Sequence, residues 1–136
     1  MIVPYLHFQK SCRAAMLFYQ DVLGGDLQMM EFSEMPDAPD HWQASDLIMH
    51  ATLATDHHGT LMASDFPPDD PGEPQQAVSI SLQLDDPREG RALFDALAAG
   101  GDAIMEFGAT FFSPGFGMCR DMFGTQWMIS VAGDQD

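Results

Sequence analysis

The stretch GGDLQMMEF at residues 24–32 returns almost unchanged as GGDAIMEF at residues 100–107. Each copy follows a segment with apolar residues at roughly helical spacing, residues 11–25 and 86–101. Both segments end in Gly-Gly, and a glycine after the last helical turn adopts the left-handed conformation that closes a helix. The repeat therefore predicts two helices, each followed by a strand that begins at the GGD copy.

The residues that we expect each helix to bury form a stripe. In the first helix they are Ala15, Leu17, Phe18, Val22 and Leu23. In the second they are Leu93, Phe94, Leu97 and Ala98, after a proline at position 87 that the first helical turn tolerates.

Strand candidates flank each helix in the same order. Residues 5–9 and 77–86 alternate before the helices. Two further strands follow each GGD copy, at 47–54 and 60–66 in the first half and at 116–121 and 125–132 in the second. The last strand of each half begins after Gly-Thr. Each half is thus predicted to be a βαβββ module.

The sequence predicts an α+β fold, a single domain of two such modules. Module one spans residues 1–66 and module two residues 77–136, and the proline-rich acidic segment 67–76 links them. One helix covers only one face of its sheet, so the other face needs a partner. We expect the modules to curl together or to pair with a second chain, as a homodimer.

The charge balance excludes several partners. Five Lys and Arg stand against 21 Asp and Glu, a formal net charge of −16. Nucleic acid and anionic membranes are bound by clustered Lys and Arg, so both are poor partners for this chain. A local positive site could come only from Lys10, Arg13, Arg88, Arg91 and Arg120.

The sequence lacks three features that would indicate secretion, a membrane span or a redox site. We find no signal peptide and no membrane-length apolar run, so we expect a cytoplasmic protein. Cys12 and Cys119 form no Cys-x-x-Cys pair, so we expect each to be a small buried hydrophobic residue.

Several stretches resemble the glyoxalase/bleomycin-resistance/extradiol-dioxygenase superfamily, also called vicinal oxygen chelate, and more narrowly its PhnB-like branch. They are VPYLHF (3–8), FYQDVLGG (18–25), MHATL (49–53), LMASD (61–65) and above all TFFSPGFGMCRDMFGTQWMI (110–129). The resemblance implies modules whose mixed sheets form a cup with the helices outside. In metal-using members, about four His, Gln or Glu ligands lie on the first and last strands of each module.

Few of these implied ligand positions hold a ligand here. The family's glutamate, four residues after the turn glycine, falls on Met128, and the same count from Gly59 gives Ala63. The first strand of module two offers Ser79 and Ser81. Such residues hold divalent cations poorly, so we expect no metal and no other cofactor.

Module one keeps more polar candidates on its first strand, where Tyr5, His7 and Gln9 share a face. His7 is a plausible ligand, or Gln9 if the register slips. His50, mid-strand, could act with His7 as an acid–base pair if both face inward. Glu106 is the carboxylate best placed to be a general base.

Other polar residues are expected to be structural or solvated. Asp65 and Asp121 stand where aspartate accepts backbone N–H bonds, and His57-His58 lie in a turn. His41 lies in the loop 33–45, which is long enough to be a lid or a dimer arm.

Methionine and phenylalanine are abundant, with 11 and 10 copies, which favours a core or an adaptable apolar pocket. We predict a ligand pocket lined by Tyr5, Gln9, Ser79, Ser81, Phe112, Phe116 and Met128.

Two functions remain open, and the sequence does not decide whether the protein is an enzyme. The first is a metal-free binding protein, or a metal-independent enzyme, for a small apolar or aromatic molecule. The alternative is a divalent-metal-dependent lyase, isomerase or dioxygenase using His7, His50 and Glu106. A methyltransferase is disfavoured, because no Gly-rich GxGxG turn follows a strand.

Overall fold

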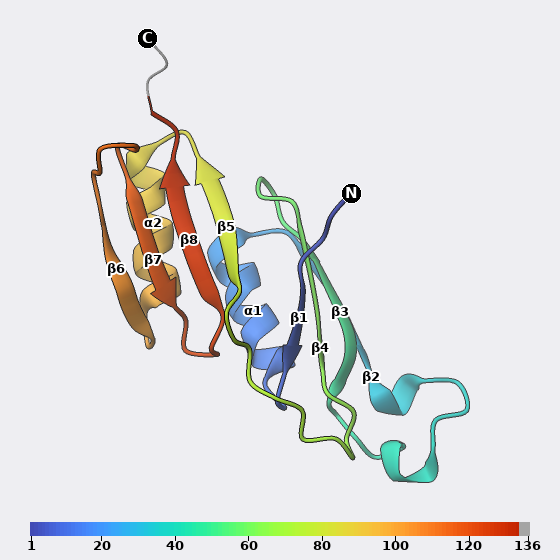
Figure 1. Ribbon diagram of the computed structural model, residues 1–136. Coiled ribbons are helices and arrows are strands. Elements are labelled where there is room, and N and C mark those ends of the chain that lie inside the picture. Colours follow the sequence, from blue (N-terminus) through green and yellow to red (C-terminus); the bar gives the residue numbers. More distant parts are fainter. Residues whose placement is uncertain (134–136) are drawn as a thin grey trace. The chain divides into compact units, whose positions relative to one another are not determined.

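The computed structural model describes residues 1–133 and divides into two compact units, Met1–Gln75 and a second that begins at Gln76. Each unit contains one helix against one four-stranded sheet (Figure 1).

The first unit runs β1 (Tyr5–Phe8), α1 (Cys12–Leu23), β2 (Asp26–Glu31), β3 (Ile48–Ala54) and β4 (Thr60–Asp65). The strand order across the sheet is β1-β4-β3-β2. The β1–β4 pair is parallel and the other two pairs are antiparallel.

The second unit repeats this topology with β5 (Ser79–Leu84), α2 (Pro87–Ala98), β6 (Asp102–Gly108), β7 (Phe116–Arg120) and β8 (Gln126–Val131). Its order is β5-β8-β7-β6, again with the first and last strands parallel. The predicted α+β fold of two βαβββ modules is confirmed, while the cup-like pairing of the two sheets stays a prediction.

The repeated Gly-Gly has a steric explanation in both units. Gly24 and Gly100 take left-handed φ angles of +73° and +78° where their helices end. Gly25 and Gly101 pass so close to the neighbouring strand that a Cβ would collide with the carbonyl oxygens of Ala54 and Arg120. Both units thus require glycine at the same two places, which explains the repeated sequence.

The buried stripe of α1 differs from the prediction. It consists of Cys12, Ala15, Met16, Tyr19 and Leu23. Leu17 remains 48% exposed, because it lies about 100° around the helix from Met16, outside that stripe. In α2 the predicted Leu93, Phe94 and Leu97 are buried, and the Asp86 side chain caps the helix by accepting a hydrogen bond from the Arg88 N–H at 2.9 Å.

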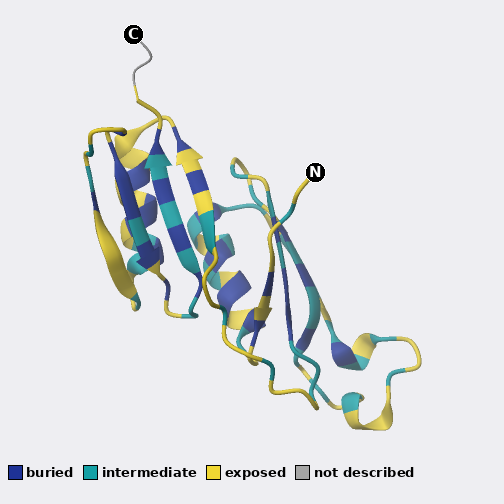
Figure 2. Cartoon of the chain, in the orientation of Figure 1, coloured by how far each residue is buried: buried dark blue, intermediate teal, exposed yellow. Residues whose placement is uncertain are grey.

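Strand alternation places one face of each sheet beneath its helix. On β8, Trp127, Ile129 and Val131 are at most 1% exposed, as predicted. The residues between them are less buried, and the colours of β8 alternate accordingly (Figure 2).

Two buried aspartates hold backbone amides, as the sequence predicted. Asp65 accepts hydrogen bonds from Cys12 N at 3.0 Å and Ile48 N at 2.9 Å. Asp121 accepts from Phe123 N and Thr125 N, and from the indole N–H of Trp127 at 2.9 Å. They connect chain segments and are not free to act as general bases.

Both cysteines are free and buried, as expected. Burial and, to a smaller extent, the Asp65 charge raise the pKa of the Cys12 thiol to about 12, against the lowering effect of Arg13. Burial, aided by Asp121, raises the pKa of Cys119 to about 11.

The long loop after β2 contains two short 3-10 turns, Phe32–Glu34 and Asp40–Trp42. Phe32 is buried and contacts the Trp42 ring edge to face, with centroids 5.2 Å apart. A role for this loop as lid or dimer arm stays a prediction.

Candidate functional site

The side of the first sheet opposite α1, which we call the open face, carries the candidate site. The strand register places its side chains in two rows across the four strands. One row contains Tyr5, Met62, Thr52 and Gln28, and the other contains His7, Ser64, His50 and Met30. His7 and His50 therefore share a face of the sheet. A shared face is the condition under which the sequence predicted that they could act as an acid–base pair.

Four rings form a continuous row on this side. Tyr5 lies between the two imidazoles, with ring centroids 5.6 Å from His50 and 5.1 Å from His7. His7 stacks in turn on Phe66, at 5.5 Å and an interplanar angle of 30°. Tyr5 is 41% exposed, so the row is accessible.

Hydrogen bonds fix the polar ends of these rings. The Tyr5 hydroxyl lies 3.0 Å from His50 Nδ1, and His50 Nε2 lies 3.0 Å from Thr52 Oγ1. Ser64 Oγ lies 3.3 Å from His7 Nδ1. A neutral imidazole has one donor and one acceptor nitrogen, so His50 can link the two hydroxyl groups in either tautomer. The arrangement can orient a polar ligand group or pass a proton along the chain.

Sequence reasoning missed Thr52, Met62, Ser64 and Phe66. Alternation along residues 60–66 could have placed Met62 and Ser64 beside the first strand. The same alternation also puts Phe66 on that face, but its stacking on His7 depends on the path of the chain after β4 ends at Asp65.

Ala63 is a correction to the predicted ligand positions. It is fully buried on the face toward α1, paired with Leu6 and Ala51. The first hairpin closes with a Thr55 N to Gly59 O bond and the second with Asp121 N to Thr125 O. Relative to these closing hydrogen bonds, the turn glycine stands one residue later in the first hairpin than in the second. Counting four residues from each glycine therefore reaches opposite faces of the two strands. The residue equivalent to Met128 is Met62.

The second sheet has its own side opposite α2. Ser81 and Met128 pair there, and Met128 also pairs with Met118 of β7. Ser79 Oγ donates to Gln126 Oε1 at 3.3 Å. Near the start of β7 the Phe112 ring meets that of Phe116 edge to face at 5.1 Å, with Phe112 54% exposed and Phe116 9%.

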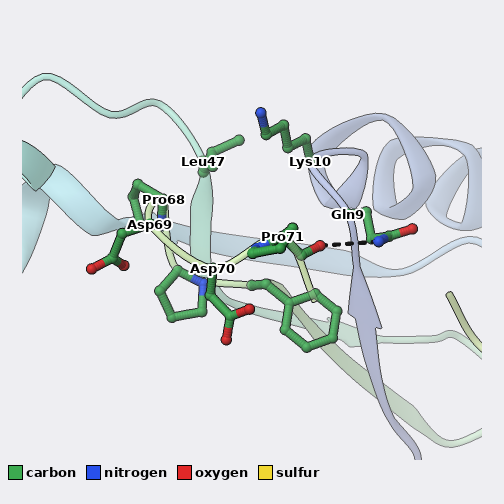
Figure 3. Close-up of a pocket in the computed structure, with 9 residues that line it drawn as sticks. Gln9, Lys10, Leu47, Pro68, Asp69, Asp70 and Pro71 are labelled. Carbon is green, nitrogen blue, oxygen red and sulfur yellow. Dashed lines mark hydrogen bonds between the residues drawn. The ribbon is translucent and has the colours of Figure 1, made fainter. Parts of the chain in front are cut away.

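Gln9 and Glu106 take different places from the other predicted site residues. Gln9 follows the end of β1, and its Nε2 donates to the carbonyl oxygen of Pro71 at 3.0 Å (Figure 3). The same Nε2 donates to the carbonyl oxygen of Gly72 at 3.2 Å. It thus holds the segment after β4. Glu106 is an exposed residue of β6, in the second unit.

The donor set does not suit a divalent metal. Within residues 1–133, no three His, Cys, Asp or Glu side chains gather closely enough to hold a metal ion. At the positions that the family resemblance singles out stand hydroxyl, amide and thioether groups, which are weak ligands for such ions. His7 is the exception, and Ser64 is its hydrogen-bond neighbour.

Over the described residues, no helix is both long and apolar enough to cross a membrane.

Known proteins match this chain along nearly its whole length. The model of the Glyoxalase/Bleomycin resistance protein/Dioxygenase superfamily matches residues 2–129. Protein YjdN of Escherichia coli is 34% identical, over 97% of this chain and 95% of its own length.

Solved structures agree with the fold. Protein PA1353 from Pseudomonas aeruginosa superposes with a TM-score of 0.88 at 43% identity, covering 98% of each chain. A PhnB protein from Bacillus cereus, described as a putative 3-demethylubiquinone-9 3-methyltransferase, has a TM-score of 0.76 at 22% identity, covering 96% of this chain and 98% of its own. The chain belongs to the glyoxalase/bleomycin resistance protein/dioxygenase superfamily and is similar to Protein YjdN within it.

Proposed function

We propose that this protein binds a small aromatic or apolar molecule on the open face of its first sheet, without a metal ion. The observation that carries the proposal is the row of four rings His50, Tyr5, His7 and Phe66 on the side of the sheet that α1 does not cover. Aromatic faces favour offset stacking with flat ligands, so the row offers a ready contact surface.

The surroundings of the rings suit such a ligand. Met30 is opposite His50 and 41% exposed, and Met62 is opposite Tyr5. Methionine side chains adapt to irregular apolar shapes. The Tyr5 hydroxyl and the imidazole nitrogens would orient a polar substituent, which is the usual division of roles in a small-molecule site.

A metal-independent role is supported by the donor set. The sulfur of Met128 and the hydroxyls of Ser79 and Ser81 stand where the family resemblance implies ligands. A metal-dependent reaction through His7, His50 and Glu106 has no comparable observation in its favour.

Acid–base catalysis without a metal is a second candidate, favoured by one specific observation. Tyr5, His50 and Thr52 form an unbroken hydrogen-bonded chain beside His7. An imidazole has one nitrogen that donates and one that accepts a proton, so such a chain can deliver or accept a proton at a bound ligand.

The proposal extends to the protein's partners and location. We propose a cytoplasmic homodimer that binds neither nucleic acid nor membranes. The net charge of −16 supports the exclusion of polyanionic partners.

The neutral dye N-phenyl-1-naphthylamine tests the binding proposal, because its fluorescence rises when it leaves water. We expect saturable binding that EDTA does not change. Replacing the ring by Tyr5→Ser should weaken binding about fivefold or more, since a stacked ring contributes about 1 kcal/mol beyond buried area.

His57→Gln is the matched control, because His57 is exposed in a turn of the same unit and lies outside the ring row. It should bind the dye as the wild type does. Equal losses in His57→Gln and Tyr5→Ser, or no saturable binding at all, would refute a site on the open face.

A further inference from the structure

A separate pocket of about 280 Å³ lies in the first unit, where β1 and β4 end. One wall consists of residues 67–71, which together with Gly72 we call the strap. The other sides include Lys10, Leu47 and Phe66 (Figure 3). This volume is close to the lower end of known ligand sites, so the pocket suits a molecule with one ring.

The strap is held in place by three different contacts. Gln9 Nε2 donates to two strap carbonyls, of Pro71 and Gly72. His41 Nε2 lies 3.3 Å from Asp69 Oδ2. Gly72 has a φ of +63° and lies against the Phe66 ring, where a Cβ would collide with that ring. The pocket is therefore a built feature of the unit.

Both strap carboxylates already have partners. Asp70 Oδ1 accepts a hydrogen bond from Gly72 N at 2.9 Å, and Asp69 pairs with His41. Hydrogen bonds from its own backbone N–H and from His41 lower the pKa of Asp69, so it stays ionised at neutral pH. In Figure 3 the Lys10 side chain points upward and the Asp70 carboxylate points downward, so the two charged groups point away from each other.

Lys10 is the cation at this pocket. No ion pair or hydrogen bond of its ammonium group is found among residues 1–133. It takes a left-handed φ of +75°, a backbone conformation that few residues other than glycine adopt. It also borders the neighbouring hollow of about 340 Å³ at the start of α1.

The other walls are apolar. They consist of Leu47, Phe66 and the proline rings of Pro67, Pro68 and Pro71. The pocket thus combines apolar walls with one ammonium group, and the two carboxylates that also line it, Asp69 and Asp70, are already engaged by His41 and by the Gly72 N–H.

We propose that this pocket binds a small apolar carboxylate, with its carboxylate on the Lys10 ammonium and its hydrocarbon part against Leu47, Phe66 and the strap prolines. The site is distinct from the open face, although the two share Phe66, whose ring stacks on His7. It goes beyond the proposed function, because it assigns a second ligand of different charge to a different place.

Benzoate, benzamide and benzylamine test the proposal, because they present one ring with a negative, neutral or positive group. We expect isothermal titration to show benzoate binding about fivefold more tightly than benzamide, and benzylamine more weakly still. Lys10→Gln should remove the difference between benzoate and benzamide, while Lys10→Arg should keep it.

Arg88→Gln removes another exposed cation, from the second unit, and should leave benzoate binding unchanged. Chemical shift mapping of the wild type should place benzoate at residues 9–10, 47 and 66–71. The neutral dye should still bind the open face of Lys10→Gln, so failure here and failure of the proposed function are separable.

Several results would overturn the proposal. They are equal affinities of wild-type protein for benzoate and benzamide, tighter binding of benzylamine, and benzoate shifts confined to Tyr5, His7 and His50. Absence of benzoate binding in the millimolar range would also overturn it, since a one-ring ligand in a matching pocket should reach that affinity.

Discussion

Asp65 joins three parts of the first unit through one carboxylate. It ends β4, while its two oxygens hold the first amide of α1 and the first amide of β3. It is 3% exposed, so water cannot replace either bond.

Asp65→Asn should lower the free energy of unfolding by about 2–3 kcal/mol. The amide keeps one acceptor but turns an N–H₂ donor toward a backbone N–H, which leaves that buried donor unpaired. Urea unfolding measures the loss. Asp26→Asn, at an exposed position of β2, is the control, and an equal small effect in both variants would contradict this reading.

Two glycines of the first unit, Gly25 and Gly59, differ in how much space surrounds them. Gly25→Ala should cost about 3 kcal/mol or more, because its Cβ would collide with the Ala54 backbone. Gly59→Ala should cost only about 1 kcal/mol, because Gly59 has φ +84° but open space around it. Urea denaturation of both variants gives the comparison, and a larger loss in Gly59→Ala would be inconsistent with the structure.

The two thiols should resist alkylation in the folded protein. With pKa values of about 12 and 11, Cys12 and Cys119 are almost wholly protonated at pH 8, and both are buried. Iodoacetamide should alkylate these two thiols far more slowly than it alkylates the free thiol of glutathione. The alkylation rate should rise as urea unfolds the chain. Fast labelling of native protein at either cysteine would disprove this.

At the scale of elements, strand alternation decides which side chains reach a ligand. On β8 it was readable from the sequence, because Trp127, Ile129 and Val131 are bulky and apolar, while Gln126 and Ser130 on the other face are polar. The prediction failed at Ala63, where the turn glycine shifts by one residue between hairpins. Turn geometry sets register, and a one-residue change inverts the face.

Neighbouring substitutions on β8 test this alternation. Met128→Glu should unfold at nearly the wild-type urea concentration, because its side chain lies on the side opposite α2. Ile129→Glu should lose several kcal/mol, because it would bury an unpaired carboxylate beneath α2. Similar losses in both would mean that the register is wrong.

Long-range contacts account for most of what the sequence could not predict. His7 and His50 could be nominated from their strands, but their shared partner Tyr5 and the stacking of His7 on Phe66 depend on β1 pairing with β4. The pocket beneath the strap was also unpredicted. The strap reads as a proline-rich linker, and its hydrogen bonds to Gln9 join residues more than 60 positions apart.

At the scale of the whole molecule, the chain combines a superfamily scaffold with an altered set of side chains. The family model covers residues 2–129, yet serine and methionine stand at most of the positions where the resemblance implies metal ligands, with His7 as the exception. One fold supports many chemistries, so the side chains and not the scaffold must decide the function.

Native mass spectrometry of the purified protein, before and after a chelator, tests metal-free ligand binding most directly. The account predicts a homodimer whose mass does not change on chelation, with any copurified mass belonging to a small organic molecule. Stoichiometric metal that the chelator removes would contradict the account and favour the metal-dependent enzyme.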